Sequence, residues 1–248
     1  MGHQKRTALV TGGNRGLGEA IAQALHQAGH NVIVTHTPGN AKVAAWLKTQ
    51  ASQGYDFAAY GVDVSDFDST QELARAIQAD GRKVDILVNN AGITRDSTLR
   101  KLDFANWDLV LRTNLYSMFN VSKLFLDPMV ERGWGRIINI SSINGTKGQF
   151  GQTNYSAAKA GVHGFTMALA QEVARKGVTV NTVSPGYLAT QMVMAIPQET
   201  RQRIIDAIPM GRLGVPAEIA ALVTFMAGDA AAFMTGSNVA MNGGQHMH

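Results

Sequence analysis

The sequence has no cysteine among its 248 residues. Without thiols there is no disulfide, no cysteine nucleophile and no thiolate metal site. A chain of this kind suits a cytoplasmic protein, and we expect that location. The histidines near the end, His246 and His248, are too few and too close to the terminus to indicate metal binding, so we predict no metal.

Long apolar runs and a charge of one sign are also missing. No stretch reaches the ~20 apolar residues of a membrane-spanning helix, and the basic residues before Thr7 lead directly into a short apolar segment. We therefore expect neither a membrane span nor a secretory leader, with Gly2 and His3 in a short exposed tail. The net charge is only +4, and the sequence contains no block of like charges. That balance suits a phosphorylated small molecule better than a nucleic acid, so no nucleic-acid partner is predicted.

The chain does contain a regular alternation of short apolar segments and amphipathic ones. With 45% hydrophobic residues it can bury a large core. Strands are expected at 7–11, 31–35, 57–64, 85–88, 136–140, 179–184 and 239–241, and helices at 41–53, 65–79, 103–130, 155–174 and 216–228. This order predicts an α/β fold in which residues 1–248 form a single doubly wound (Rossmann) domain, with a seven-stranded parallel sheet flanked by helices. Within it, we expect residues 188–213 to form a mobile substrate flap.

The first predicted strand runs into a glycine-rich turn, Gly12-Gly13-Asn14-Arg15-Gly16-Leu17-Gly18, and a helical pattern follows. Strand, glycine turn and helix is the arrangement that holds a pyrophosphate at a helix N-terminus. Gly12 permits the tight turn, Gly16 lets the backbone approach the phosphates, and Gly18 allows the helix to pack closely on the strand. The turn therefore predicts a dinucleotide site.

The second predicted strand ends in Thr35-His36-Thr37, without a carboxylate. In NAD-binding folds an acidic residue near this point holds the ribose 2′-hydroxyl. Arg15, with His36 and Lys42 as weaker candidates, is placed to meet a 2′-phosphate instead, unless Arg15 is an ordinary surface side chain. We predict NADP rather than NAD.

Several other polar or glycine-containing segments follow predicted strands, namely Asp63, Asn89-Asn90-Ala91-Gly92, Ser142 and Pro185-Gly186. In a doubly wound sheet ligands bind outside the carboxyl ends of the strands. We therefore expect these segments to converge on one crevice. Asp63 either meets the adenine or closes a turn, and the sequence leaves both open.

Tyr155 and Lys159 stand four residues apart on a predicted helix that Asn154 is expected to cap, so they share a face. A free phenol has a pKa near ~10. A neighbouring ammonium lowers that pKa and so tunes the phenol for proton transfer near working pH. Ser142, at a strand end, is placed to hydrogen-bond the oxygen whose charge changes. A Tyr-x-x-x-Lys spacing also arises by chance, so its meaning depends on its surroundings.

Together these motifs resemble the short-chain dehydrogenase/reductase family. The resemblance rests on Thr-Gly-x-x-x-Gly-x-Gly at 11–18, Asn-Asn-Ala-Gly at 89–92, Asn114, Ser142, Tyr155-x-x-x-Lys159 and Pro185-Gly186, and it covers essentially the whole chain. It implies a catalytic tetrad of Asn114, Ser142, Tyr155 and Lys159, although Asn114 also reads as a satisfied core amide. It also implies a homotetramer, with contacts through the helices at 103–130 and 155–174. The predicted cofactor contacts are Gly12, Asn14, Arg15, Gly16, Leu17, Gly18, Asp63, Val64, Asn90, Ala91, Gly92, Tyr155, Lys159, Pro185 and Gly186.

Segments 90–96, 148–155, 164–172 and 180–187 resemble the NADPH-dependent acetoacetyl-CoA reductases of polyhydroxybutyrate biosynthesis, while 3-oxoacyl-[acyl-carrier-protein] reductases are similar over most of the same motifs. The block 149–152 favours the CoA thioester. This resemblance implies reduction of acetoacetyl-CoA to (R)-3-hydroxybutyryl-CoA, with Tyr155 as proton donor and Asn114 anchoring a water. The expected substrate contacts are Asp96, Gln149, Phe150, Gln152 and Tyr187, with Arg95, Arg100, Lys101 and Lys147 near the CoA phosphates. A dinucleotide-binding regulator without turnover is the alternative from another class.

Overall fold

In the computed structural model the described part of the chain is residues 5–247. The predicted tail residues Gly2 and His3, and the terminal His248, lie outside that range. Within it, seven strands form one sheet in the order β3-β2-β1-β4-β5-β6-β7, and every neighbouring pair is parallel. The prediction of a seven-stranded doubly wound sheet is confirmed. The strands are β1 Thr7–Val10, β2 Asn31–His36, β3 Phe57–Gly61, β4 Ile86–Asn89, β5 Gly135–Ile140, β6 Val178–Pro185 and β7 Asn238–Met241.

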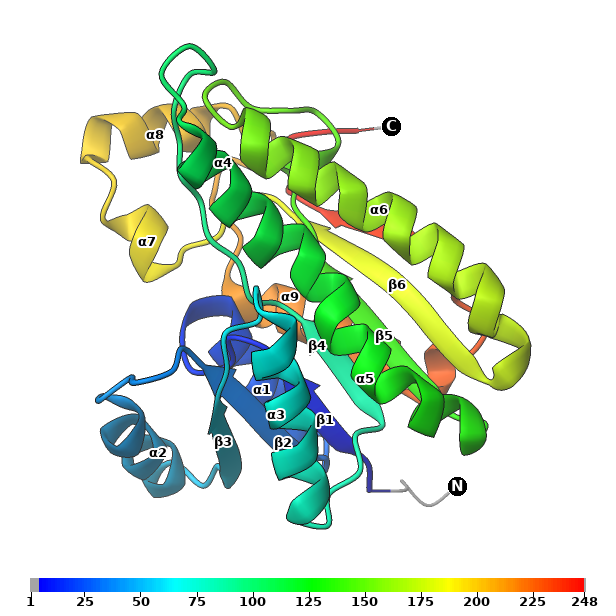
Figure 1. The fold of residues 1–248 in the computed structure, drawn as a ribbon. Helices are drawn as coiled ribbons and strands as arrows, with labels where there is room; N and C mark the ends of the chain where they lie inside the picture. The colour runs from blue at the N-terminus through cyan, green and yellow to red at the C-terminus, as the bar shows by residue number, and fades with distance from the viewer. Residues whose placement is uncertain (1–4, 248) are drawn as a thin grey trace.

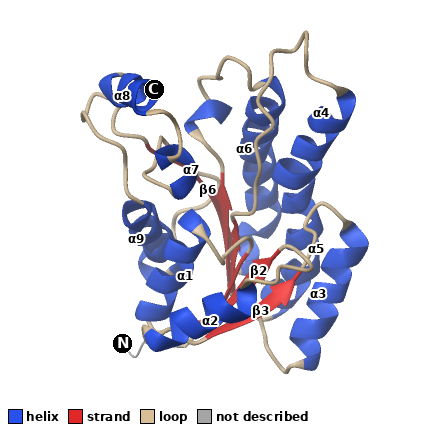
Figure 2. Cartoon of the chain, turned by 90° about the vertical axis from the view of Figure 1, so that its left-hand side faces the viewer, coloured by secondary structure: helices blue, strands red, loops and turns tan. Residues whose placement is uncertain are grey.

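Helices cover both faces of this sheet, which Figure 2 shows between two helical layers. The helices are α1 Gly16–Gln27, α2 Val43–Ser52, α3 Phe67–Ala79, α4 Phe104–Leu111, α5 Ser117–Glu131, α6 Thr153–Val173, α7 Gln191–Met194, α8 Gln198–Asp206 and α9 Pro216–Ala227. Short helical turns are η1 Arg112–Tyr116, η2 Ile143–Gly145, η3 Ala174–Lys176 and η4 Asp229–Ala231. In residues 5–247 we find no helix with the length and apolarity needed to span a bilayer.

Alternating strand residues supply two hydrophobic cores, one on each face of the sheet. In β1, Val10 packs with Ile21 of α1 and Val223 of α9. Its neighbour Leu9 packs on the other face with residues of α3, α5 and α6. Successive side chains of a strand point to opposite faces, and both faces are covered, so β1 carries apolar side chains towards both of them. α7 and α8 stand apart from these two layers, beyond one end of the sheet (Figure 1).

The single long helix expected at 103–130 is wrong in detail. Asp103 does cap it, because the Asn106 backbone N–H donates to Asp103 Oδ1 at 2.7 Å. However, η1 is a π-helical turn that separates α4 from α5. A π turn accommodates an extra residue in the helix and is frequent at functional sites. It carries Asn114, which is fully buried.

Two other boundaries differ from the sequence prediction. α6 begins at Thr153, and Gln152 occupies the cap position, so Asn154 is not the cap. The Asn154 side chain is instead buried, where it accepts from the Tyr155 backbone N–H at 2.8 Å. β3 ends at Gly61 rather than at 64, because Asp63 closes a turn in which its Oδ1 accepts from the Ser65 backbone N–H at 2.9 Å.

A chain of buried polar side chains fastens α6 to the sheet. Asn89 Nδ2 of β4 donates to Asn139 Oδ1 of β5 at 2.8 Å, and Asn139 Nδ2 donates to Thr166 Oγ1 of α6 at 2.9 Å. The Thr166 and Thr182 hydroxyls share a hydrogen bond of 2.7 Å. Buried polar groups need such partners, and here the requirement aligns three strands with the helix that carries Tyr155.

Replacing Asn139 with Leu should therefore destabilise the fold by about 2–4 kcal/mol, because it leaves the Asn89 amide and the Thr166 hydroxyl without this buried partner. Thr182→Val, which removes one hydroxyl at the end of the same chain, should cost about 1 kcal/mol. Urea unfolding of both variants measures the difference. Equal midpoints for the two would contradict the proposed importance of the chain.

Candidate functional site

A cleft of about 720 Å³ opens at the carboxyl ends of the first four strands. Its walls include the following residues that the sequence predicted: Gly12, Asn14, Arg15, Gly16, Leu17, Gly18, His36, Asp63, Val64, Asn90, Ala91 and Gly92. The segments expected to converge from β1, β3 and β4 are thus brought together, as the rule for doubly wound sheets requires. Lys42 lies outside this cleft, before α2.

The glycine turn is shaped by close contacts that only glycine permits. A Cβ on Gly18 would lie 2.3 Å from the carbonyl oxygen of Gly12 and 2.6 Å from Asn90 Nδ2. The backbone of Gly12 has a φ of 62°, in the left-handed region. The Thr11 hydroxyl also accepts from the backbone N–H groups of Asn90 and Ala91, each at 2.9 Å. The turn after β1 and the segment after β4 therefore form one wall at the N-terminus of α1.

These features fit a dinucleotide. The N-terminus of α1 presents unpaired backbone N–H groups and a positive dipole to the cleft, which suits a pyrophosphate. Arg15 is exposed on the same wall, opposite a β2 end made of Thr35, His36 and Thr37. Asp63 both lines the cleft and closes a turn, so the two readings that the sequence left open are compatible.

Other walls of the cleft were not expected to contact the cofactor: Thr35, Thr37, Val62, Ser65, Ile93, Arg95, Leu109, Thr113, Thr190 and Gln191. Thr35 and Thr37 stand at the end of β2. The rule that ligands bind at strand ends, which identified Asp63, could therefore have identified them from the sequence as well. Leu109 and Thr113 come from α4 and η1. Their position depends on how that helix packs, which no local pattern indicates.

None of the four predicted catalytic residues lines the cleft itself, but two of them, Asn114 and Lys159, lie next to Gly92 in its wall. A Cβ on Gly92 would lie 2.6 Å from Asn114 Oδ1 and 3.7 Å from Lys159 Nζ. The Ser142 hydroxyl lies beside the Tyr155 phenol and lowers its pKa. Ser142 is held at the start of η2, where its hydroxyl oxygen accepts from the Asn144 backbone N–H at 3.1 Å.

Burial decides the proton affinity of Tyr155. The pKa of the phenol is raised to about 12: burial is the main cause, the lowering by Ser142 opposes it, and the charge of Asp96 adds to it. The expectation that Lys159 lowers this pKa is wrong in this structure. The Lys159 ammonium lies 5.7 Å from the centre of the tyrosine ring and donates to the Ile140 carbonyl oxygen at 2.8 Å. Tyr155 consequently stays protonated through the neutral range.

Lys159 is itself a buried cation. Only 3% of it is exposed, and the loss of hydration lowers its pKa to about 8. Besides the bond from Nζ, its backbone is fixed: its carbonyl oxygen accepts from the Ser141 hydroxyl at 2.8 Å. The ammonium is therefore held at one place on the floor of the site.

Asn114 is satisfied by backbone groups. Its Nδ2 donates to the carbonyl oxygens of Ile93 and Val110, each at 2.9 Å, and its Oδ1 accepts from the Ile93 backbone N–H at 3.2 Å. Both amide protons are used, and Oδ1 keeps one lone pair. The structure thus shows Asn114 holding the backbone that follows β4.

The predicted substrate residues divide into two groups. Asp96 and Gln152 hydrogen-bond one another, and the pKa of Tyr187 is raised by burial and by the Asp96 charge. By contrast, Gln149 and Phe150 are exposed, Phe150 by 87%. Gly186 and Tyr187 line a second, smaller cavity of about 210 Å³ rather than the cleft, and Pro185 ends β6.

No group of three or more His, Asp or Glu side chains within residues 5–247 is arranged to hold a metal ion. The chemistry that these groups offer is therefore that of a protonated phenol, a hydroxyl and a buried ammonium beside a phosphate-binding turn. Such a set suits proton transfer to an oxygen that gains charge.

Comparisons with known proteins agree with this arrangement. Residues 6–201 match the family model of short chain dehydrogenases. The acetoacetyl-CoA reductase of Cupriavidus necator is 53% identical over 243 residues, which cover 98% of this chain and 99% of that protein. A 3-oxoacyl-[acyl-carrier-protein] reductase of Pseudomonas aeruginosa is 45% identical, with full coverage of both chains. A crystal structure from Agrobacterium tumefaciens, assigned as a gluconate dehydrogenase, superposes with a TM-score of 0.92 at 33% identity, covering 97% of this chain and 95% of that one.

The buried ammonium makes stability depend on pH. Because the folded-state pKa of Lys159, about 8, lies below its ordinary value of 10.5, the unfolded chain binds more protons between these values, and stability rises with pH there. We expect the difference in unfolding free energy between wild type and Lys159→Met to rise from about pH 8 to about pH 10. Urea unfolding at several pH values measures it, and a flat difference would contradict the buried charge.

Proposed function

The chain belongs to the short-chain dehydrogenase family, and from that premise we propose that it is an NADPH-dependent acetoacetyl-CoA reductase. The observation that carries the proposal is the placement of the Tyr155 phenol beside Ser142 and 5.7 Å from Lys159, whose ammonium lies next to Gly92 in the wall of the cleft. The product would be (R)-3-hydroxybutyryl-CoA, which polyhydroxybutyrate synthesis consumes. The C. necator relative supports the CoA thioester. A cytoplasmic location stays a prediction.

In the proposed reaction NADPH, when bound, supplies the hydride for the ketone carbon. The Tyr155 hydroxyl gives its proton to the carbonyl oxygen, and its protonation at neutral pH is the form that this step needs. The Ser142 hydroxyl holds the same oxygen by a hydrogen bond. Lys159, whose ammonium is fixed by its bond to the Ile140 carbonyl oxygen, would bind the nicotinamide ribose. Asn114 keeps the backbone of Ile93 in place, and water anchored at its remaining lone pair would return the proton.

The proposed cofactor contacts follow from the walls of the cleft. The glycine turn and the N-terminus of α1 would hold the pyrophosphate, and Arg15 the 2′-phosphate of NADP. Arginine pairs with phosphate through charge-assisted hydrogen bonds. The end of β2 offers Thr35, His36 and Thr37 and so brings no carboxylate that would repel this phosphate.

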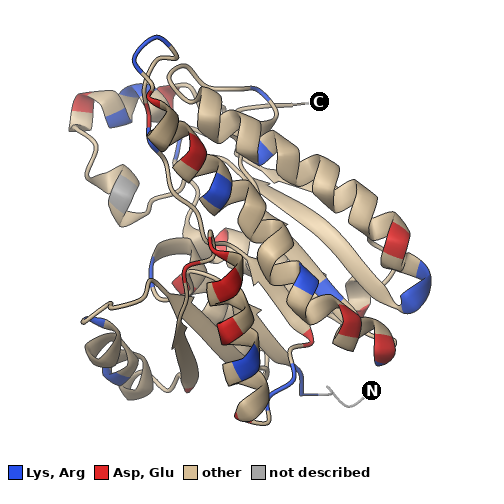
Figure 3. Cartoon of the chain, in the orientation of Figure 1, with Lys and Arg blue, Asp and Glu red and all other residues tan. Residues whose placement is uncertain are grey.

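We place the acyl thioester between the tyrosine and the segment 188–213. Tyr187 immediately precedes that segment, and Thr190 and Gln191 within it line the cleft. No residue of α8 is buried, as expected for a part that moves separately from the core and closes over substrate. The loop before α4 carries Arg100 and Lys101, and basic positions are visible there at the top of the molecule (Figure 3), suited to the CoA phosphates.

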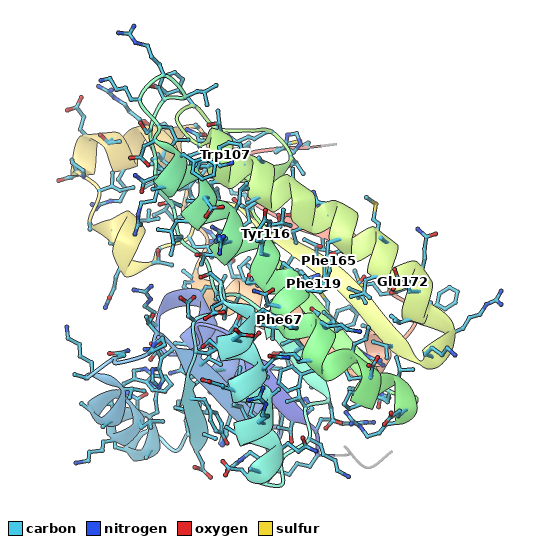
Figure 4. The ribbon with its side chains drawn as sticks, in the orientation of Figure 1. Phe67, Trp107, Tyr116, Phe119, Phe165 and Glu172 are labelled. Carbon is cyan, nitrogen blue, oxygen red and sulfur yellow. The ribbon has the colours of Figure 1, made fainter. Side chains whose placement is uncertain are left out.

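The homotetramer also remains part of the proposal. η1, α5 and α6 present an exposed apolar face on which Tyr116, Phe119 and Met167 are each about half exposed, at 49%, 53% and 52%. Figure 4 shows Tyr116, Phe119 and Phe165 on these neighbouring helices, with Phe67 next to Phe119. The rings of Phe67 and Phe119 stack with centroids 6.0 Å apart. A contiguous apolar face of this kind is typical of a protein–protein contact.

The activity is tested by following NADPH oxidation with acetoacetyl-CoA. Wild type should turn over, and Tyr155→Phe should lose at least about a thousandfold in kcat while its affinity for NADPH, measured by fluorescence titration, changes less than about twofold. A Tyr155→Phe variant with near-normal kcat would disprove the assignment. Comparing kcat/KM for acetoacetyl-CoA with that for acetoacetyl-[acyl-carrier protein] separates the two thioester classes. NADPH binding without turnover on either would instead support a regulator.

Arg15→Ala should raise the KM for NADPH about tenfold and leave that for NADH unchanged, because one charge-assisted contact with the 2′-phosphate is worth about 1.5–3 kcal/mol. Lys48→Ala removes an exposed cation from α2 and should change neither value. Steady-state kinetics with both cofactors measures this. Equal losses with NADH and NADPH would show that Arg15 does not read the 2′-phosphate.

A further inference from the structure

Gln152 joins two segments that reach the active site from different strands. Its Nε2 donates to Asp96 Oδ2 at 2.8 Å, in the loop after β4, and its Oε1 accepts from Asn144 Nδ2 at 2.9 Å, in the turn after β5. Asn144 is buried, and Gln152 is only 9% exposed. We call this set, Asp96, Gln152 and Asn144, the amide bridge.

The bridge fixes the direction of the Gln152 amide. In the observed orientation the NH2 group faces a carboxylate and the carbonyl faces an NH2 donor. A rotation of 180° would place oxygen against Asp96 and nitrogen against Asn144 Nδ2, which breaks both bonds and leaves groups of like polarity in contact. Burying such groups unpaired is costly. The amide is consequently locked.

Two members of the bridge are connected to the reacting groups. At one end, the backbone N–H of Asn144 donates to Ser142 Oγ, the hydroxyl that pairs with the phenol. In the middle of the bridge, Gln152 stands at the cap of α6, three residues before Tyr155. Two further bonds fasten the Asp96 loop to the start of this helix: Ser97 N–H to the Gly151 carbonyl at 2.8 Å, and Asn154 Nδ2 to the Arg95 carbonyl at 3.1 Å.

We propose that Gln152 is a positioning residue whose amide holds the Ser142 turn and the Asp96 loop in register with Tyr155. The sequence suggested only a substrate contact for Gln152 and assigned no role to Asn144. The inference deepens the proposed function, since it concerns how the serine and the tyrosine of that site are kept at hydrogen-bonding distance.

The test is an exchange of polarity across the bridge. Gln152→Glu keeps the shape and the bond from Asn144 but sets a carboxylate against Asp96, so kcat should fall by roughly tenfold or more. Asp96→Asn alone should lower kcat less, because an amide at 96 can still present its carbonyl oxygen to Gln152 Nε2. In the double variant, Asp96→Asn with Gln152→Glu, the new amide donates to the new carboxylate, and kcat should return to within about threefold of wild type.

Kinetics with two substrates distinguish a positioning role of Gln152 from a direct contact with the substrate. With acetoacetyl-CoA and with ethyl acetoacetate, which has no CoA, a positioning role lowers kcat by similar factors and leaves both KM values within about twofold. Gln78→Glu makes the same chemical change at an exposed position of α3 and should alter neither. A rise in KM confined to acetoacetyl-CoA, or a double variant no faster than the slower single variant, would overturn the proposal.

A readout without turnover keeps this result distinct from the assignment of the substrate. Asp96 is exposed, so its replacement leaves the core intact. In urea unfolding, the double variant should have a higher midpoint than Gln152→Glu, because the pairing is restored. No recovery would overturn the bridge even if acetoacetyl-CoA is reduced, and recovery would support it even if the substrate proves to be another ketone.

Discussion

The buried ammonium of Lys159 is the constraint on which the site depends. A charge placed in the protein interior loses its hydration and must be compensated by nearby polar groups. Here the Ile140 carbonyl at the end of β5 accepts from Nζ, and the Ser141 hydroxyl binds the lysine carbonyl in return. Helix α6 is thereby fixed to the carboxyl end of β5. The same attachment sets where Tyr155 lies, one helical turn earlier, and the polar chain from Asn89 to Thr182 extends it through the core.

Much of the fold could be predicted from the sequence. Apolar segments of strand length alternate with helical patterns along the chain. Together with the glycine turn after the first strand, this alternation indicates a doubly wound sheet. The errors lie where local pattern and tertiary context disagree. The third strand is shorter than predicted because the Asp63 carboxylate closes a turn there instead of continuing the strand. The cap of α6 was misplaced because the Asn154 side chain is needed by the Arg95 backbone, a contact across 59 positions of the chain.

The sequence predicted that several candidate residues gather at one edge of the sheet, but it did not predict their electrostatics. Spacing alone places Tyr155 and Lys159 on one face, and the rule for strand ends gathers the glycine turn, Asp63 and Asn90. Spacing does not say how deeply a phenol is buried, and burial raises the pKa of Tyr155 where proximity to Lys159 suggested a decrease. In the same way Gln152 could be chosen as polar and near the tyrosine, whereas its partners, Asp96 and Asn144, come from loops that only the folded chain brings together.

The π-helical turn η1 has a consequence for how this region tolerates change. Each residue advances a helix by about 100°, and the extra residue in η1 lets α4 face α6 while α5 turns Val121, Phe125 and Met129 towards the sheet. Deleting one residue here would give a smoother helix but would rotate one of those faces away from its neighbour and carry Asn114 out of reach of Ile93. Substitutions in this segment should therefore be tolerated more easily than changes in its length. We expect insertions and deletions in related chains to lie elsewhere.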